Sequence, residues 1–351
     1  MRILYIGNEA TSTTSFHRAS ALKRLGHYVD IRNPELAVEK QLNNPITGRI
    51  HYRTGYRFIQ NKINKWLSFV LNDTVLPDLI WVDGGEFMGT KSLELLKSLE
   101  VPVVLYNVDD PTGKRDGNRF KSLLKALPLY DMVVVVRKET AEECRKLGAL
   151  NTVLVSRSYD EEAHKPYNDP KDVPSEFRSG IAFIGTWMRH EKRDEFLLKL
   201  IDKGLPVSIW GDRWQKSPHW NRLKIFYQGG SLSGRDYVAA IQGAKICIGM
   251  LSKGNRDLHT TRSLEIPYIG GLLCAERTSE HQEMYKENEE AVFWSDAEEC
   301  AKVCKELLNN SEKREKIRQA GMQRVKENKA GNENICAIIL NKLKEHELVW
   351  S

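Results

Sequence analysis

The sequence predicts an α/β protein made of two doubly wound units, each a parallel sheet with helices on both faces. Short apolar stretches alternate with longer amphipathic stretches along most of the 351 residues, which is the rhythm of repeated βα units. The rhythm is interrupted over 161–180, where polar residues and prolines replace it, and it then starts again. A chain of this length is also long enough for two domains of ordinary size.

The first half opens with a βαβ unit. Residues 2–7 form an apolar strand, 15–25 have helical periodicity and 28–31 form the next strand. The loop after the first strand is not Gly-x-Gly-x-x-Gly, so the dinucleotide fingerprint is absent. His17 lies near the first turn of the helix, where it is either a general base or acceptor-site donor, or a solvated histidine.

Acidic residues follow two later strands of the first half, 78–83 and 101–107. In an open parallel sheet, ligands bind just beyond the carboxyl ends of the strands, so carboxylates there are placed for acid–base work. Asp83-Gly84 and Asp110-Pro111 are also common turn formers, which is the alternative interpretation. The candidate catalytic residues are Asp109, Asp110, His17 and Asp83.

The segment 49–71 is basic and aromatic. It contains five Arg or Lys residues and no acid, with Tyr52, Tyr56, Phe58 and Trp66 interleaved. Such a segment can rest on an anionic membrane surface, or it can be an ordinary helix with an apolar core face and solvated charges. Single-stranded nucleic acid is bound by a similar pattern, but nothing else in the sequence supports it, and we expect no nucleic-acid partner.

The composition is that of a soluble globular protein. The formal charge of +6 is modest, 41% of the residues are hydrophobic, and no apolar run is long enough for a transmembrane helix or a signal peptide. Six cysteines are scattered along the chain. Cys300 and Cys304 could share a helix face, but no second pair has metal-ligand spacing, so we expect reduced thiols in a cytoplasmic protein.

The most informative stretch of the second half is 254–277, which follows the apolar strand 246–250. It indicates a loop, a short helix, a Gly-Gly break and a buried strand. A helix N-terminus at the carboxyl edge of a parallel sheet favours an anion. Arg256, His259 and Arg262 add donors, and the carboxylate of Glu265 suits hydroxyl groups. A diphosphate clamp beside a hydroxyl acceptor fits a nucleotide-sugar.

Other parts of the second half add to this candidate site. The strand that begins at residue 181 ends in the turn Gly185-Thr186, whose backbone can approach a phosphate closely, and Arg189 follows it. The candidate residues for binding a nucleotide-sugar are Gly185, Thr186, Arg189, Arg256, His259, Arg262, Glu265 and Gly270.

The run HTTRSLEIPYIGGLL, which begins at His259, resembles the donor-binding segment of GT-B glycosyltransferases of the group 1 type. It is most similar to the spore-maturation (CgeB-like) branch, whose members show the pattern R-x-[FL]-E-[IA]-P-x-x-G-G. The resemblance covers roughly 180–330. It departs from retaining families that carry two glutamates eight positions apart, because here Asp257 stands eight residues before Glu265.

The resemblance implies a GT-B fold, in which two Rossmann-like doubly wound domains face each other across a cleft. Residues 1–160, with the C-terminal helix 333–351 returning to them, would bind the acceptor. Residues 161–180 would be a linker, and 181–332 would bind the nucleotide-sugar.

The implied function is a hexosyltransferase-like glycosyltransferase that moves a sugar from a nucleotide-diphosphate sugar, UDP-linked for example, to an acceptor hydroxyl. The acceptor would be a glycan, a lipid-linked molecule or a protein, in cell-envelope, spore-coat or surface polysaccharide synthesis. A lipid-linked acceptor would place the enzyme at the inner face of the membrane. We expect no metal and no cofactor, because Arg262 and the helix N-terminus would stabilise the leaving diphosphate and no D-x-D motif is present. The alternatives are a nucleotide-sugar epimerase of the same fold, or an inactive nucleotide-sugar-binding assembly protein.

Overall fold

The computed structural model describes residues 1–350, with side chains described as far as residue 345. It contains two compact units. Unit 1 consists of Met1–Ser156, Gly254–Arg256 and the chain from Asn332 onward, and unit 2 consists of Arg157–Lys253 and Asp257–Gly331. Across the described residues, no helix is both long and apolar enough to cross a membrane.

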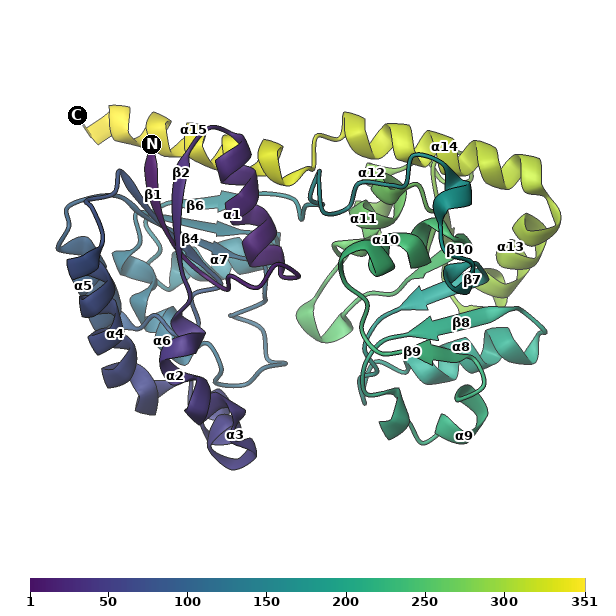
Figure 1. The fold of residues 1–351 in the computed structure, drawn as a ribbon, viewed down its shortest axis with the longest axis horizontal. Helices are drawn as coiled ribbons and strands as arrows, with labels where there is room; N and C mark the ends of the chain where they lie inside the picture. The colour runs from purple at the N-terminus through teal and green to yellow at the C-terminus, as the bar shows by residue number, and fades with distance from the viewer. Residues whose placement is uncertain (351) are drawn as a thin grey trace. The chain divides into compact units, whose positions relative to one another are not determined.

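Unit 1 is built on a parallel sheet with the strand order β2-β1-β3-β4-β5-β6 (Figure 1). Its strands are β1 (Arg2–Ile6), β2 (Tyr28–Arg32), β3 (Leu79–Asp83), β4 (Val103–Asn107), β5 (Met132–Val135) and β6 (Thr152–Leu154). Its α-helices are α1 (Thr14–Arg24), α2 (Pro34–Asn43), α3 (Pro45–Arg53), α4 (Gln60–Asp73), α5 (Thr90–Lys97), α6 (Lys121–Ala126), α7 (Lys138–Lys146) and α15 (Asn332–Trp350), and its 3-10 helices are η1 (Arg57–Ile59) and η2 (Leu127–Leu129). The strand order reverses between β1 and β3, and such a switch point is where open α/β sheets bind ligands.

Alternate residues of the four central strands of unit 1, β1, β3, β4 and β5, belong to different core clusters, as the period of a β-strand requires. Leu4 of β1 belongs to the cluster that includes α4 and α5, whereas Ile3 belongs to the cluster that includes α1. Ile335 and Ile339 of α15 lie in the second cluster, and α15 packs beside α1 (Figure 1). The C-terminal helix therefore completes the core of the first half of the chain.

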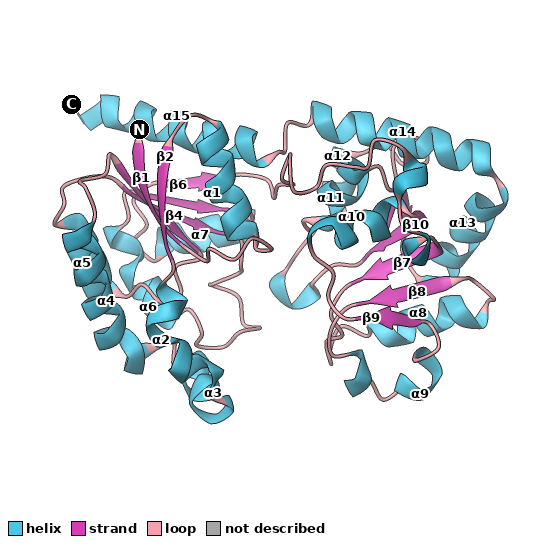
Figure 2. Cartoon of the chain, viewed as in Figure 1, coloured by secondary structure: helices cyan, strands magenta, loops and turns pink. Residues whose placement is uncertain are grey.

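Unit 2 has the strand order β12-β11-β10-β7-β8-β9, again all parallel (Figure 2). Its strands are β7 (Ser179–Ile184), β8 (Val207–Trp210), β9 (Tyr227–Gly229), β10 (Ala244–Gly249), β11 (Leu273–Glu276) and β12 (Val292–Trp294). Its α-helices are α8 (Arg193–Asp202), α9 (Trp220–Leu223), α10 (Gly234–Gln242), α11 (Arg262–Ile269), α12 (Ser279–Met284), α13 (Ala297–Asn309) and α14 (Ser311–Glu327). Its 3-10 helices are η3 (Pro170–Asp172), η4 (Ser175–Phe177) and η5 (Trp214–Lys216), and η6 (Lys253–Asn255) lies where the chain passes into unit 1. Here the switch point lies between β7 and β10.

The stretch 161–180 is not a linker but part of unit 2. The backbone N–H of Tyr167 donates to Gln242 Oε1 at 2.7 Å, and Gln242 Nε2 donates to the Tyr167 carbonyl at 3.0 Å. Tyr167 and Phe177 also pack against the core cluster that contains α10. The stretch has the composition of a linker because it contains little regular secondary structure, but its aromatic side chains bind it to the sheet unit.

The basic segment 49–71 is not one helix. Gly55 and Tyr56 take left-handed conformations, with φ of +65° and 58°, and they separate α3 from η1 and α4. α4 buries Ile63 and Leu67 in the core of unit 1. The apolar face of this part of the segment is therefore already used for folding, although Phe69 of α4 stays exposed; α3 and η1 also present large apolar side chains next to basic ones.

Candidate functional site

The turn after β7 stands at the switch point of unit 2 and is held from several sides. Gly185 donates its N–H to the Trp210 carbonyl at 2.9 Å, and its own carbonyl accepts from Trp214 Nε1 at 2.8 Å. A Cβ at Gly185 would lie 2.9 Å from the Phe183 ring, so a larger residue would displace that ring. The tight packing fixes the backbone of this turn.

Arg193 links the two loops at this switch point. Its guanidinium donates to the carbonyl of Thr186, after β7, at 2.9 Å and to the carbonyl of Leu251, after β10, at 3.1 Å. Sequence reasoning missed Arg193, because a charged residue at the start of a helix carries no signal of its partners. Arg189, which the sequence analysis assigns to the diphosphate, lies exposed on the loop between β7 and α8.

Arg262 is the first residue of α11, and its guanidinium lies near the ring of Tyr237, with Cζ 6.0 Å from the ring centroid. Its Nε is buried and has no hydrogen-bond partner among the described residues. A buried donor without a partner costs free energy, typically about 1–3 kcal/mol. Such a group is expected where a ligand completes the site.

The amides at the start of α11 are less open than the sequence analysis expects. The N–H groups of Leu264 and Glu265 donate to the Thr261 carbonyl at 2.9 and 2.8 Å, and that of Ser263 donates to the Thr260 carbonyl at 3.0 Å. A tight first turn satisfies these donors within the helix, so they do not point at a phosphate. The positive charge at this helix start therefore comes chiefly from the Arg262 side chain.

Glu265 lies one turn further along α11 and is buried, with 6% of its surface exposed. Its Oε2 accepts from the Tyr237 hydroxyl at 2.5 Å. Burial and the charge of Glu265 raise the pKa of Tyr237 far above the ordinary value, so this hydroxyl stays a donor. Oε1 lies 3.7 Å from His164 Nε2, which is too long for a hydrogen bond.

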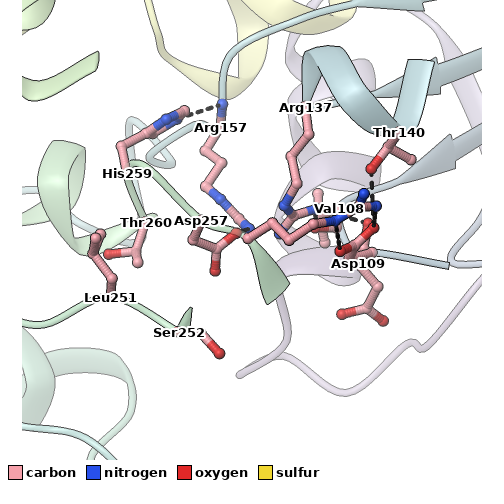
Figure 3. A network of polar contacts seen from close by, with 12 residues as sticks. Val108, Asp109, Arg137, Thr140, Arg157, Leu251, Ser252, Asp257, His259 and Thr260 are labelled. Atoms are coloured by element: carbon pink, nitrogen blue, oxygen red, sulfur yellow. Dashed lines mark hydrogen bonds and ion pairs between the residues drawn. The ribbon is translucent and has the colours of Figure 1, made fainter. Parts of the chain in front are cut away.

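His259 is a structural residue in this geometry. Its Nε2 accepts from the backbone N–H of Arg157 at 3.4 Å (Figure 3). Its Nδ1 bonds to Glu280 Oε2 at 2.5 Å. Arg157 also pairs with Asp257 at 2.8 Å. Both ring nitrogens are therefore engaged in holding the loop before α11, and the predicted contact of His259 with a diphosphate is not available without breaking one of these bonds.

Gly270 stands at the other end of α11 from Arg262. It takes a left-handed φ of 89°, as a helix-ending glycine does, and its carbonyl accepts from Arg318 Nη1 at 2.7 Å. Eight helical residues separate the two ends of α11 by about 12 Å. The structure therefore makes Gly270 a cap of α11, and its role in binding the nucleotide-sugar stays a prediction.

Arg256 is grouped with unit 1, whereas the chain from Asp257 to Gly331 belongs to unit 2. Its guanidinium donates to both oxygens of Asp110 at 2.6 and 2.8 Å and to both oxygens of Glu143 at 2.8 and 3.0 Å. Asp110 also accepts from the Thr140 hydroxyl at 3.1 Å. Arg256 and Asp110 thus satisfy each other, and the donor-binding role of Arg256 and the catalytic role of Asp110 stay predictions that would require this pair to separate.

A cavity of about 130 Å³ lies at the switch point of unit 1, beyond the ends of β1 and β3. Three carboxylates line it, those of Glu35, Asp83 and Glu86. Asp83 Oδ2 accepts from the Tyr5 hydroxyl at 2.6 Å and pairs with Arg18 Nε at 3.0 Å. Of the four predicted catalytic residues, Asp83 is the one that lines this cavity, and it is tied into a buried ion pair.

Glu35 was missed by the sequence analysis. It follows Asn33 and Pro34 at the start of α2, where an acidic residue is an ordinary helix-start residue. Its Oε2 accepts from Asn8 Nδ2 at 2.9 Å, and burial, with the nearby charge of Glu86, raises the pKa of Glu35. The available signal was its position just after the carboxyl end of β2.

The remaining predicted residues lie elsewhere in unit 1. His17 is half-buried on α1, with Nε2 3.0 Å from the Thr11 carbonyl. The Asp109 carboxylate lies 3.5 Å from Arg119 Nη1 at the end of β4, and the Asp109 carbonyl accepts from Arg137 at 2.8 Å (Figure 3). Neither His17 nor Asp109 lines the cavity of unit 1.

His281 holds the start of α11 in place through hydrogen bonds. Its Nδ1 bonds to the Glu276 carbonyl at 2.6 Å and therefore carries the proton, so its Nε2 accepts from the Ser263 hydroxyl at 2.7 Å. Ser263 Oγ in turn accepts from the Thr260 N–H at 3.1 Å. This chain of bonds requires a neutral imidazole and fixes the loop that leads into Arg262.

The stability of unit 2 should therefore fall in mild acid. Burial lowers the pKa of His281 from the ordinary 6.5 to about 4, so the unfolded chain binds a proton that the folded chain does not. The stabilisation is complete above pH 6.5 and is lost as the pH falls toward 4, by roughly 2 kcal/mol between pH 6.5 and 5. Urea unfolding of the wild type and of His281→Gln at pH 7.5 and 5.0 measures this. The variant should lose less stability on acidification, and equal losses would rule out His281 as the cause.

Comparisons with known proteins bear on the fold of the chain. Residues 189–338 match the family described as glycosyl transferase-like, and no curated protein matches the sequence. Sucrose-phosphate synthase from Thermosynechococcus elongatus is similar in structure, with a TM-score of 0.67 and 14% identity over 100% of both chains. Anabaena Alr3699/HepE in complex with UDP-glucose has a TM-score of 0.64 and 11% identity, over 98% of this chain and 100% of that one. A putative UDP-N-acetylglucosamine 2-epimerase from Listeria monocytogenes has a TM-score of 0.57 and 12% identity, over 99% and 96%. The chain thus has the two-unit α/β fold of the GT-B glycosyltransferases, and a glycosyl transferase-like segment makes up most of its second unit.

Proposed function

We propose that this protein is a glycosyltransferase that moves a sugar from a nucleoside diphosphate sugar to an acceptor hydroxyl. The observation that carries the proposal is the arrangement of Arg262 and Glu265 on one short helix at the switch point of unit 2. The Arg262 guanidinium has a buried N–H without a partner among the described residues, and the Glu265 carboxylate lies one turn away. These two groups match the diphosphate and the hydroxyl groups of a nucleoside diphosphate sugar. The match of 189–338 to the glycosyl transferase-like family supports this assignment, and the Anabaena neighbour in complex with UDP-glucose supports a UDP-linked donor.

The residues of unit 2 take the following roles in this proposal. Arg262 binds the diphosphate and stabilises the charge that develops on it as the sugar leaves, without a metal or another cofactor. Glu265 accepts a hydrogen bond from a hydroxyl of the donor. The Gly185-Thr186 turn approaches the diphosphate, and Arg189 is exposed and close in sequence to add a second cation.

The cavity of unit 1 is our proposed acceptor site. Its carboxylates favour a ligand rich in hydroxyl groups, such as a glycan, a lipid-linked sugar or a glycosylated protein, over an anionic one. Deprotonation of the acceptor hydroxyl needs a base with a pKa near the working pH. Glu35, whose pKa is raised, joins His17, Asp83 and Asp109 as a candidate for that base.

Nucleotide binding and turnover test the proposed function directly. Purified protein is screened by thermal shift against UDP, GDP, CDP, ADP and dTDP and their common sugars, without metal and with Mg²⁺. We expect one diphosphate to raise the melting temperature selectively, and release of that diphosphate from its sugar to require an added acceptor. No shift with any nucleotide would overturn the proposal.

Epimerisation is the second candidate, because an epimerase is among the similar structures. The same assay separates the two reactions. An epimerase would convert the nucleotide-sugar to its epimer with no acceptor present, whereas a transferase leaves the sugar configuration of unreacted donor unchanged. Binding of a nucleotide-sugar with neither reaction would favour an assembly protein that has lost catalysis.

We further propose that unit 1 contacts the inner face of an anionic membrane, as suits a hexosyltransferase-like enzyme of the spore-maturation branch that builds cell-envelope or surface glycans. Ile46, Arg49, Ile50 and Arg53 share one face of α3, and Ile46 and Ile50 are 73% and 46% exposed. Phe58 is 58% exposed next to them in sequence. Apolar side chains among cationic ones are the pattern of an interfacial helix.

Vesicle binding measures this contact. The paired change Ile46→Glu with Ile50→Glu should weaken binding to phosphatidylserine-containing vesicles by about tenfold or more, because it removes apolar insertion and adds charge repulsion. Ile225→Glu is the matched control, since Ile225 is 74% exposed in unit 2. Equal binding by all three proteins, or no binding by the wild type, would refute the membrane contact and leave the transfer reaction unaffected.

A further inference from the structure

Three buried cysteines of unit 2 come together behind the sheet. Cys274 lies on β11, and Cys300 and Cys304 lie one turn apart on α13, so both face the strand. The Sγ atoms of Cys274 and Cys304 are 3.9 Å apart, those of Cys300 and Cys304 are 4.0 Å apart, and all three lie within 4.8 Å of one another. Sequence spacing predicted only the pair on the helix; the fold supplies the third sulfur.

The spacing fits a metal ion bound by three sulfurs. A metal–sulfur bond is about 2.3 Å long, so three sulfurs around an ion in a plane lie about 4.0 Å from one another. The two measured Sγ–Sγ distances therefore need little movement to become two edges of such a triangle. Thiolate ligands select soft ions such as Cu(I) and Zn²⁺ over hard ones such as Mg²⁺ and Ca²⁺.

The surroundings decide which soft ion fits better. The three side chains are fully buried in the same apolar cluster as Ile248, Leu272 and Leu307. Within the described part of the chain, no fourth His, Cys, Asp or Glu joins the group. Zn²⁺ takes a fourth ligand from protein or water, and an apolar core offers no path for either. Cu(I) has the same number of electrons as Zn²⁺ but a single positive charge, and three sulfur ligands complete its coordination.

We propose that Cys274, Cys300 and Cys304 form a three-coordinate Cu(I) site that joins β11 to α13. Binding turns thiols into thiolates and releases their protons to solvent, so affinity rises with pH. The site is independent of sugar transfer and lies on the far side of β11 from the core cluster that includes α11.

Anaerobic titration of the full-length protein with Cu(I), against a chromophoric Cu(I) chelator, tests the site. Because the sulfurs are buried, the protein is also refolded in the presence of Cu(I), so that slow entry is not mistaken for lack of affinity. We expect one Cu(I) for each chain, X-ray absorption with three sulfur neighbours, and Zn²⁺ bound more weakly than Cu(I).

Alanine variants locate the ion. Cys304→Ala should weaken Cu(I) binding by about a hundredfold or more, since two sulfurs remain. Cys247→Ala is the matched control and should bind as the wild type does, because Cys247 is equally buried in unit 2 but belongs to the other core cluster. If Cys304→Ala does not fold, Cys300→Ala and the absorption spectrum of the wild type carry the test. Three results would each overturn the proposal. They are no Cu(I) uptake by the wild type, unchanged Cu(I) affinity in a folded alanine variant of Cys274, Cys300 or Cys304, and a fourth ligand in the absorption spectrum.

Discussion

Arg262→Ala will lower kcat/KM for sugar transfer by about 10²–10³-fold, the usual loss when one donor to a developing negative charge is removed. The change should not unfold the protein. In the ligand-free structure the Arg262 Nε is a buried donor without a partner among the described residues, so its removal relieves a cost. The melting temperature of the free variant is therefore expected to equal or exceed that of the wild type, while the shift caused by the cognate nucleoside diphosphate is lost.

Arg318→Ala is the control for this prediction. Arg318 is also a partly buried arginine against α11, but it donates to the Gly270 carbonyl at the opposite end of the helix. Its loss should lower the free energy of unfolding by about 1 kcal/mol and leave transfer nearly unchanged. Full activity in Arg262→Ala, or a fall in stability as large as that of the control, would contradict the assignment of Arg262 to the leaving group.

The architecture was predictable because it depends on periodicity, which a single sequence displays. The alternation of apolar and amphipathic stretches predicts strands such as β3 and β10 and helices such as α1 close to their observed bounds. The break over 161–180 misled the prediction for a physical reason. Tyr167 and Phe177 bury their rings in unit 2, and isolated aromatic residues in an irregular stretch give no periodic signal.

The direction of a candidate site residue was predictable only where its place on a regular element decides that direction. Arg262 and Glu265 are three positions apart on a helix, so they share one side of it. His259 and Arg256 stand in the irregular loop before that helix, where direction depends on each backbone angle. Arg256 has a left-handed φ of 56°, and its guanidinium pairs with Asp110 in unit 1. No pattern of residue spacing in the sequence predicts that the Arg256 side chain points to Asp110.

The acidic residues of unit 1 also show that a sequence predicts a residue's position better than its partners. Asp83 and Asp110 stand at the carboxyl ends of strands, as predicted, but each is bound by an arginine that the sequence does not link to it, Arg18 and Arg256. A carboxylate held in this way is anchored by a guanidinium. Glu35 accepts from the neutral side-chain amide of Asn8 instead, and burial raises its pKa.

Arg18→Met separates the structural role of Asp83 from a catalytic one. Arg18 lies buried between Asp83, 3.0 Å from its Nε, and the ring of Tyr106, whose centroid is 4.0 Å from Cζ. Replacing one partner of a buried ion pair leaves the other charge uncompensated, and the expected loss is about 3–5 kcal/mol of unfolding free energy. Hydrogen exchange of the β1 and β3 amides against urea concentration measures this loss within unit 1.

Arg32→Met is the matched change, because Arg32 pairs with Asp30 at 3.0 Å while both side chains stay partly exposed. A partly exposed pair contributes at most about 1 kcal/mol, so this variant should stay close to the wild type. A similarly small loss in Arg18→Met would mean that Asp83 is not anchored, and its carboxylate would again be available as the base. The other outcome is that Arg18→Met is strongly destabilised while a folded Asp83→Asn keeps its transfer activity. In that case Asp83 serves only to form the ion pair. The proton of the acceptor hydroxyl must then go to another group at the cavity, and Glu35 is the carboxylate best suited to take it.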